Sequence, residues 1–392
     1  MFLNKSVHFS SKYDMIISRL EKEYLQMKTI QQELPDFKPT YPLTRIAPLD
    51  KILFVDIETT GFTAKSSTLY LIGCAWYNGS TWIITQWLAT TYEEEKEILE
   101  AFFNFAASYT HLIHFNGNHF DLPFMLQKSI QYDLECDFTS YEGIDLYKRI
   151  SPYKLFLRLP NCKQKTLEQF LGINRIDTFN GGELIGIYHD YVSIPSDVSE
   201  RLLLQHNADD MRGMLSILPM LAYYDLFNRE VRVKKVQANH YKNVNGLQSQ
   251  ELLMSLELPT VLPNAVSGSF EGCYFSATGS EGLFKIPLYE EELKYFYSNY
   301  KDYYYLPAED IALHKSVASF VDKNHRTQAT AATCYTRKLS TYLPQWEIVV
   351  EPFFKRDYKS KVYFFEVTEE LKKDRNIFTA YAKHLLDMLG TC

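Results

Sequence analysis

Residues 51–61 read KILFVDIETTG. The apolar, β-branched first half of this stretch is typical of a buried strand, and the polar residues that follow mark its end. Because residues two apart in a strand point to the same face, Asp56 and Glu58 are expected to project together. Two adjacent carboxylates repel each other and resist burial, and a divalent cation such as Mg²⁺ or Mn²⁺ removes that cost. The alternative interpretation is a solvated strand end with two ordinary acids.

A third carboxylate follows a turn further along the chain. Residues 115–123 read FNGNHFDLP, in which a strand ends, a turn follows and a helix begins near Asp121. An acid at a helix N-terminus often does no more than cap the helix or interact with its dipole. Asp121 therefore points to a functional site only in combination with the other acids.

A fourth carboxylate lies on a long helical segment with a histidine beside it. Residues 205–211 read QHNADDM, and His206 and Asp210 are spaced i, i+4, so they share one face of the helix. Asp209 points to another side. Taken alone, the pair could be a surface ion pair, which stabilises a protein only slightly.

Together, these three segments offer four carboxylates and a titratable histidine. If they converge in the folded chain, the acids can hold two cations about 3.5–4 Å apart. That arrangement stabilises the attacking and leaving oxygens when a phosphodiester bond is hydrolysed.

The surrounding sequence predicts a mixed sheet with helices on its faces. Residues 69–77 and 81–88 flank Asn78-Gly79-Ser80, a hairpin signal that implies antiparallel pairing. A short strand is expected at 111–115. Helices are expected at 92–107, 120–130, 144–150 and 164–171, and a long helical segment at 196–227 that Pro219 should kink. This order of strands and helices indicates an α/β fold.

The two ends of the chain differ from this central part. Residues 1–50 predict an amphipathic helix at about 13–28 and then a proline-containing linker. After about residue 230 we expect a second domain, of the α+β class. Its expected strands are 270–277, 282–287, 346–354 and 361–367, and its expected helices are 289–300, 307–321 and 368–389. The predicted domains are therefore 1–50, 51–228 and 229–392.

The composition excludes several classes of protein. The chain has 392 residues, 46% of them hydrophobic and 23% charged, which excludes a disordered or collagen-like chain. No run approaches the ~20 uncharged apolar residues that span a bilayer, and the N-terminus lacks the apolar stretch of a signal peptide, so no membrane association is expected. The six cysteines lie far apart without disulfide or zinc spacing, which favours reduced thiols and a cytoplasmic location.

The charge balance limits how nucleic acid could be bound. The net charge is -7, whereas proteins that grip nucleic acid over a long stretch are usually strongly basic. The acidic excess lies in the first 230 residues. Any nucleic-acid substrate must therefore be held locally.

In this order, the three acidic segments resemble the Exo I, Exo II and Exo III motifs of the DEDD 3′–5′ exonucleases, which have the ribonuclease-H-like fold. More narrowly, DIETTG, FNGNHFDLP and HNADD resemble the motifs of the YprB-type ribonuclease-H-like proteins. Residues 162–168 (CKQKTLE) and 171–173 (LGI) fit the helix that lies between the second and third motifs in that group. The resemblance covers roughly residues 50–225 and implies a ribonuclease-H-like mixed sheet with flanking helices.

The resemblance also implies roles for individual residues. Asp56, Glu58, Asp121 and Asp210 would hold two Mg²⁺ or Mn²⁺ ions, with Asp56 bridging both. His206 would orient or deprotonate the attacking water, for which an unperturbed histidine pKa of about 6.5 is suited. The two main subgroups space the last motif as Tyr-x3-Asp or His-x4-Asp, whereas this chain has His with x3 spacing, so the role of His206 stays open. The implied reaction releases 5′-nucleoside monophosphates from the 3′ end of a DNA or RNA strand.

Substrate contacts are expected next to the carboxylates. The expected contact residues are Thr59, Gly61, Phe62 and Asn116. Phe62 or the Phe115-Asn116 turn could stack on the terminal base, although Phe62 could equally pack in the core. Residues 295–305 (YFYSNYKDYYY) contain seven aromatics in eleven residues and have Lys and Arg residues nearby. They could bind a single strand, or they could form an aromatic core.

Two other functions are compatible with the same motifs. The chain could bind nucleic acid on a nuclease fold without cleaving it, or it could cut internally as ribonuclease-H-type endonucleases do. The presence of all four acids argues against the first of these. The sequence does not identify any protein partner.

Overall fold

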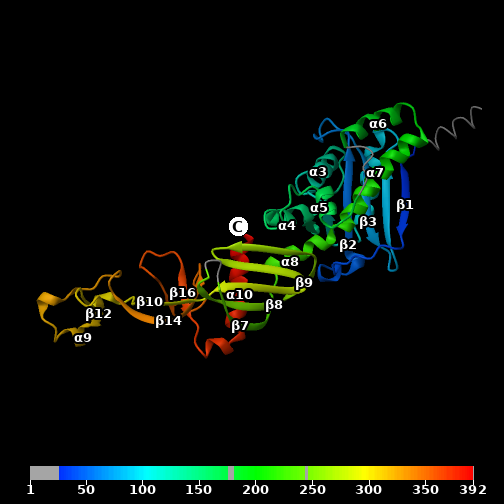
Figure 1. Cartoon of the computed structure of the whole chain (residues 1–392). Coiled ribbons are helices and arrows are strands. Elements are labelled where there is room, and N and C mark those ends of the chain that lie inside the picture. The colour runs from blue at the N-terminus through cyan, green and yellow to red at the C-terminus, as the bar shows by residue number, and fades with distance from the viewer. Residues whose placement is uncertain (1–25, 175–180, 243–245, 392) are drawn as a thin grey trace, which may run out of the picture. The chain divides into compact units, whose positions relative to one another are not determined.

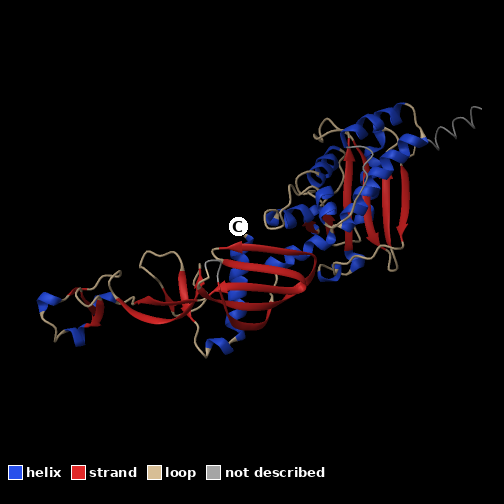
Figure 2. Ribbon diagram, in the orientation of Figure 1, coloured by secondary structure: helices blue, strands red, loops and turns tan. Residues whose placement is uncertain are grey.

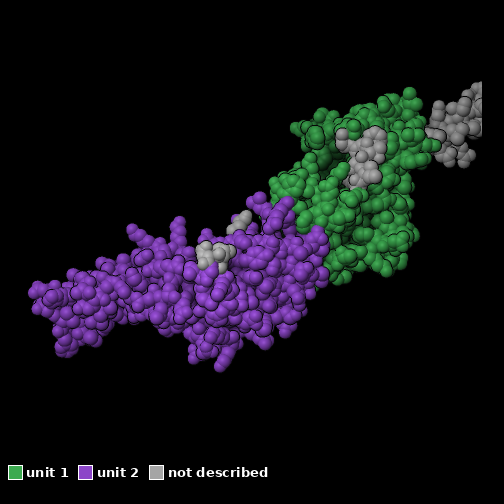
Figure 3. Space-filling view, viewed as in Figure 1, with its two compact units in different colours: residues 1–154, 159–221 green, residues 155–158, 222–392 purple. Residues whose placement is uncertain are grey.

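The computed structural model describes residues 26–174, 181–242 and 246–391. The chain divides into two compact units, coloured separately in Figure 3. Unit 1 comprises Met1–Lys154 and Leu159–Leu221, and unit 2 comprises Leu155–Arg158 and Ala222–Cys392. Within the described residues, no helix is both long and apolar enough to cross a membrane.

Unit 1 is built on a six-stranded mixed sheet with the strand order β1-β4-β3-β2-β5-β6 (Figure 1). The strands are β1 (Lys28–Leu34), β2 (Ile52–Thr59), β3 (Leu69–Tyr77), β4 (Trp82–Leu88), β5 (His111–His114) and β6 (Glu142–Asp145). Strands β1 to β4 pair antiparallel, whereas β5 is parallel to β2 and β6 is parallel to β5. This sheet confirms the predicted α/β class and the predicted hairpin of β3 and β4.

Helices cover both faces of this sheet. On one face, α2 (Glu95–Ala106) and α3 (Asp121–Gln131) pack on Leu53, Val55 and Ile57 of β2. On the other, α6 (Gly181–Ser193) and α7 (Asp197–Ser216) pack on Tyr70 and Leu88 of β3 and β4. The remaining helices of this unit are the short α4 (Leu146–Ile150) and α5 (Gln164–Phe170). Most of these helices were expected from sequence, but α6 was not.

The N-terminal prediction needs a correction. The expected helix at about 13–28 lies almost wholly outside the described residues. The expected linker begins instead with β1, which pairs along its whole length with β4. Its polar sequence, KTIQQEL, has no apolar alternation because it is an edge strand that faces solvent over much of its surface.

Unit 2 is rich in strands (Figure 2). The long strands β7 (Arg232–Lys242), β8 (Gln248–Phe270) and β9 (Cys273–Pro287) form an antiparallel sheet. Helix α10 (Arg375–Gly390) contacts β7 and β8, and α8 (Leu221–Asn228) precedes β7. A second sheet has the order β10-β14-β16-β15, formed by Tyr289–Phe296, Tyr335–Gln345, Tyr363–Glu366 and Phe353–Phe354. A third, β12-β11-β13, is formed by Ile311–His314, Tyr303–Leu306 and Thr327–Gln328.

Two helices expected in this half are wrong. The segment 289–300 begins with strand β10, which pairs antiparallel with β14 from Tyr289↔Tyr342 to Phe296↔Tyr335. Its three glutamates favour a helix locally, but its tyrosines pack against partners far along the chain, and such tertiary contacts override propensity. The segment 307–321 contains strand β12 and only the four-residue helix α9 (Lys315–Ala318). The expected strand at 346–354 is confined to Phe353–Phe354.

Candidate metal and catalytic site

The end of β2 presents its carboxylates to α7. Leu53, Val55 and Ile57 point into the core that contains α2 and α3. Because side chains alternate along a strand, Asp56 and Glu58 point to the opposite face, which α7 covers. The two acids therefore lie on the same face of β2, as the alternation of side chains along a strand predicts.

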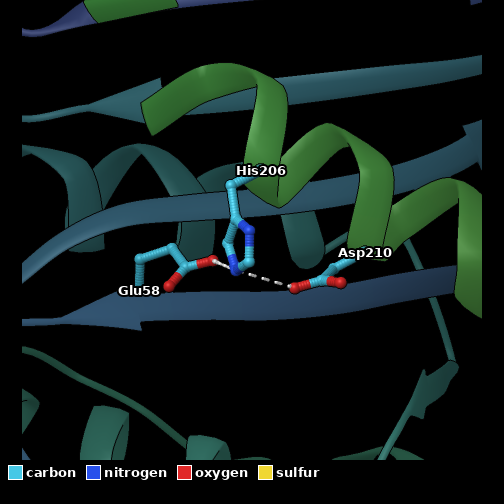
Figure 4. Close-up of side chains that lie close together, drawn as sticks. All are labelled: Glu58, His206 and Asp210. Atoms are coloured by element: carbon cyan, nitrogen blue, oxygen red, sulfur yellow. Dashed lines mark ion pairs between the residues drawn. The ribbon is translucent and has the colours of Figure 1, made fainter. Parts of the chain in front are cut away.

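Helix α7 places a histidine and a carboxylate over Glu58 (Figure 4). The Nε2 atom of His206 lies 3.2 Å from Oδ2 of Asp210 and 3.8 Å from Oε1 of Glu58. One potential ligand atom from each of the three residues lies within 4.8 Å of the others. All three side chains keep a small exposed fraction, between 13% and 25%, so the group is open to a substrate.

Asp56 is held by a residue next to His206. The side-chain amide of Asn207 donates to Oδ2 of Asp56 over 2.9 Å, and its Oδ1 accepts from Nε2 of Gln86 over 2.9 Å. Gly73 pairs with Asp56 in the β2–β3 register and with Gln86 in the β3–β4 register, so it lies between these two residues. A Cβ atom at Gly73 would lie 2.0 Å from Oδ1 of Asn207, so only glycine leaves room for this contact.

Asp121 is joined to β2 through the main chain. Its Oδ1 accepts from the backbone N–H of Ile57 over 3.2 Å, and Ile57 is the residue between Asp56 and Glu58. Asp121 is the first residue of α3 and is buried. This hydrogen bond ties the start of α3 to the strand end that carries the first two acids.

The loop before Asp121 is held by two buried side chains. Asp145 accepts from the backbone N–H of Asn116 over 3.0 Å and from that of Asn118 over 3.4 Å. Nδ1 of His114 accepts from Gly117 N–H over 3.1 Å. Asn116 has a φ of 62°, a left-handed conformation that asparagine tolerates better than most residues. The loop is therefore held by the last residues of β5 and β6, His114 and Asp145.

Burial and mutual repulsion raise the pKa values of the acids. Burial, and then the charges of Asp121, Glu58 and Asp210, raise the pKa of Asp56 well above its usual value, against the lowering effect of the Asn207 hydrogen bond. Burial, followed by Asp210 and Asp121, likewise raises the pKa of Glu58. Burial raises the pKa of Asp121 to about 7, although backbone N–H groups oppose that rise.

This donor set fits divalent cations. No Lys or Arg among the described residues forms an ion pair with Asp56, Glu58 or Asp121. Carboxylate oxygens are hard ligands of the kind that Mg²⁺ and Mn²⁺ prefer, and a bound cation would remove the repulsion that raises these pKa values.

The expected substrate contacts lie around the same strand end. Oγ1 of Thr59 donates to the carbonyl oxygen of Gly61 over 2.8 Å, which closes the turn after β2. Phe62 is 92% exposed and touches Phe120 edge-on, with 6.2 Å between ring centroids. The alternative that Phe62 packs in the core is therefore wrong. Asn116 lies in the loop that leads to Asp121.

Sequence reasoning missed three residues that shape this site. All three are buried: Asn207 donates to Asp56, Gln86 donates to Asn207, and Asp145 accepts from the loop before Asp121. Gly73 in the middle of an apolar strand was the available signal for a close approach there. Asp145, an acid at the end of a short strand, gave a weaker one.

Comparisons with known proteins agree with this fold. The model of a family described as RNase_H superfamily matches residues 53–222. This segment contains β2 to β6, α2 to α7 and all five predicted catalytic residues. Residues 53–222 therefore form a ribonuclease-H-like domain. None of the curated proteins matches the chain.

The solved structures that match part of this chain are distant from it. A family B DNA polymerase from Pyrobaculum calidifontis is 13% identical, with 52% of this chain and 30% of the polymerase covered and a TM-score of 0.38. E. coli exonuclease I in complex with a dT13 oligonucleotide is 11% identical, with 53% of this chain and 54% of the exonuclease covered and a TM-score of 0.26. The chain thus matches about a third of the first protein and about half of the second.

Proposed function

We propose that this protein is a divalent-metal-dependent 3′–5′ exonuclease of the DEDD type. The proposal rests on the arrangement of Glu58, His206 and Asp210, which each offer one potential ligand atom within 4.8 Å of the other two. Hydrogen bonds hold Asp56 and Asp121 at the same strand end. Carboxylates that face one another in a buried setting repel one another, and bound divalent cations relieve that cost. Such a cost is typical of a functional site.

The chain's own groups have separable tasks in this reaction. Two Mg²⁺ or Mn²⁺ ions, held by Asp56, Glu58, Asp121 and Asp210, would lower the pKa of the attacking water and stabilise the leaving 3′-oxygen. His206, between Glu58 and Asp210, is placed to orient that water and to accept its proton at Nε2. Asn207 keeps one oxygen of Asp56 engaged, which leaves the other for a ligand.

The proposed substrate is the 3′ end of a single DNA or RNA strand. The exposed ring of Phe62 can stack on the terminal base, because every base presents a π-face. The turn that contains Thr59 and Gly61 and the loop that contains Asn116 would border the terminal nucleotide. We propose further that residues 51–228 carry the chemistry and that residues 229–392 are an accessory domain. The free thiols of the described cysteines favour the cytoplasm as the place of action.

The test uses labelled strands and isosteric variants. Purified protein is incubated with Mg²⁺ or Mn²⁺ and with DNA and RNA strands that carry the label at the 5′ or the 3′ end. Removal of the 3′ label as a mononucleotide is expected, together with stepwise shortening of the 5′-labelled strand. EDTA, Asp56→Asn and Asp210→Asn should each abolish the reaction. Asp209→Asn is the matched control, because Asp209 lies on the same helix but bonds to Gln205 and Arg212.

The outcomes separate the competing functions. If both the 5′-labelled and the 3′-labelled strands give internal fragments, the protein is an endonuclease and not an exonuclease. Binding without cleavage under all metal conditions would favour a nucleic-acid-binding protein that no longer turns over. Activity that survives in Asp210→Asn would contradict the proposed site.

A further inference from the structure

A strongly basic stretch lies within the acidic first 230 residues, and all of it except Leu155–Arg158 belongs to unit 1. Residues 146–167 contain six basic residues and no Asp or Glu, in a chain whose net charge is -7. The six are Lys148, Arg149, Lys154, Arg158, Lys163 and Lys165. The flanking acids, Asp145 and Glu168, are both buried and so contribute little to the surface. The local charge of this stretch is therefore opposite to that of the unit around it.

The beginning of this stretch is joined to the loop that leads to Asp121. The backbone N–H of Lys148 donates to Oδ1 of Asp145, the same oxygen that accepts from the backbone N–H of Asn116. The ring of Tyr147 lies edge-on to that of Phe115, with 6.0 Å between centroids. Lys148 is thus separated from the proposed substrate loop by one shared carboxylate.

The end of the stretch is joined to the helix that carries Asp210. Lys163 directly precedes Gln164, whose Nε2 donates to the backbone carbonyl of Asp210 over 2.9 Å. Gln164 approaches so closely that a Cβ atom at Gly213 would lie 2.4 Å from its Nε2. Lys163 therefore directly precedes a residue that contacts the main chain of Asp210.

Lys154 lies near the middle of the same stretch. Burial raises the pKa of the Cys162 thiol, and the nearby positive charge of Lys154 opposes that rise. Cys162 is the residue before Lys163, so Lys154 lies near the segment that leads to Lys163.

These three lysines have no acidic partner among the residues that the structure describes. Lys148 and Lys163 are exposed and Lys154 is half-buried, and no ion pair includes any of them. Other cations of unit 1 do have partners, as in the pairs Lys28–Glu200, Lys128–Glu95 and Arg212–Asp209. Unneutralised cations that border a proposed phosphodiester site are placed to contact phosphates.

We propose that Lys148, Lys154 and Lys163 form a phosphate-binding track for the sugar-phosphate backbone of a single strand whose 3′ end enters the carboxylate site. This inference rests on the proposed function. It explains how an acidic protein can hold a polyanion, because each lysine that contacts a phosphate releases a condensed counterion. The ligand is the phosphodiester chain itself, so the track does not distinguish DNA from RNA.

The test compares two matched triple variants. Lys148→Gln, Lys154→Gln and Lys163→Gln are combined in the inactive Asp210→Asn protein. The control combines Lys38→Gln, Lys51→Gln and Lys96→Gln, which likewise removes two exposed lysines and one half-buried lysine from unit 1. Binding of fluorescent dT12 and rU12 strands is measured by anisotropy over a range of salt concentrations.

The track predicts a change in both affinity and salt dependence. At about 0.7 counterions per phosphate contact on a single strand, the slope of log K against log salt should fall by about 2 in the track variant. Affinity at low salt should fall roughly tenfold or more, whereas the control variant should match its parent. The corresponding Lys→Arg triple, which keeps the charge, should restore the slope for both dT12 and rU12. A slope that falls for one strand but not for the other would contradict a track that contacts the phosphates alone.

A kinetic measurement separates this inference from the proposed function. In the active protein, the track variant should raise KM for a 12-nucleotide strand by a much larger factor than KM for a dinucleotide, which has too few phosphates to reach all three lysines. If the two Gln triples have equal slopes and equal KM values, the track is wrong even though the protein is a nuclease. If the wild-type protein hydrolyses neither substrate, it is the proposed function that fails.

Discussion

The side-chain amide of Asn207 donates to Oδ2 of Asp56 over 2.9 Å, from a helix 151 positions further along the chain. Asn207 is fully buried, and its other polar atom is occupied by Gln86. Since Asn207 follows His206 directly, the helix that positions the histidine also fixes the orientation of the first carboxylate. Asn207 is thus a positioning residue for the proposed metal site.

Asn207→Ala should weaken metal binding more than it weakens the fold. Loss of the hydrogen bond frees the Asp56 carboxylate to rotate, and changes in residues that orient metal ligands typically cost about 10- to 100-fold in metal affinity. Titration calorimetry with Mn²⁺ measures this effect directly. Gln205→Ala is the control, because Gln205 lies on the same helix and bonds only to Asp209 among the described residues. Equal Mn²⁺ affinity in both variants would contradict the positioning role.

Asp121→Asn should stabilise the metal-free protein. Asp121 is buried, and its carboxylate adds to the repulsion around Asp56 and Glu58. Asparagine keeps an oxygen that can accept from Ile57 N–H but carries no charge. In EDTA at pH 8 the variant should gain about 1 kcal/mol or more in its free energy of unfolding, since one pKa unit corresponds to about 1.36 kcal/mol.

The same variant should lose the stabilisation that cations provide. Mn²⁺ should raise the melting temperature of the wild-type protein by mass action, because it binds only the folded site. The rise should be much smaller in Asp121→Asn. Thermal unfolding of the wild type and of the variant, each with and without Mn²⁺, gives the four melting temperatures. A metal-free variant that melts below the metal-free wild type would show that Asp121 has a structural rather than an electrostatic role.

The parts of this site that could be predicted from sequence depend on local geometry. Alternation along β2 put Asp56 and Glu58 on one face, and helical spacing put His206 and Asp210 on another. Both rules use the positions of neighbours in the chain, so they hold whatever the rest of the molecule does.

The parts that could not be predicted depend on contacts between distant segments. Gln86 reaches Asn207 only because β4 lies under α7, and β10 is a strand only because β14 lies beside it. Strand β1 reads as a polar linker until its partner β4 is known. In each case the partner that determines the structure lies tens of residues or more away, and the sequence of the segment itself does not identify that partner.

Phe62→Ala should weaken substrate binding without affecting the fold. The ring of Phe62 is 92% exposed, so its removal leaves no cavity. If it stacks on the terminal base, the loss should be about 1–3 kcal/mol, seen as a rise in KM of roughly 5- to 150-fold. Phe320→Ala is the matched control, because Phe320 is 91% exposed in unit 2 and is expected to leave KM unchanged. An unaltered KM in Phe62→Ala would assign that ring to some other contact.

Unit 2 should lose stability in mild acid because of His384. This histidine is buried, and its Nε2 accepts from the backbone N–H of Trp346 over 3.0 Å. Burial lowers the pKa of His384 below its usual value of about 6.5, against the opposing charges of Glu347 and Asp387. The unfolded chain therefore binds a proton that the folded chain resists. The stability contributed by neutral His384 is complete above about pH 6.5 and is lost as the pH falls below it, by at most about 1.4 kcal/mol per pH unit.

Hydrogen exchange measures this loss at the group that reports it. Exchange of the Trp346 amide should accelerate between pH 6.5 and 5, after correction for the intrinsic rate, because protonated Nε2 can no longer accept its hydrogen bond. In His384→Gln, which keeps an acceptor but does not titrate, the acceleration should disappear. His325→Gln is the control, since His325 is exposed and its replacement should leave the pH dependence intact. If His384→Gln and the wild type respond alike to acid, another group in unit 2 must take up the proton.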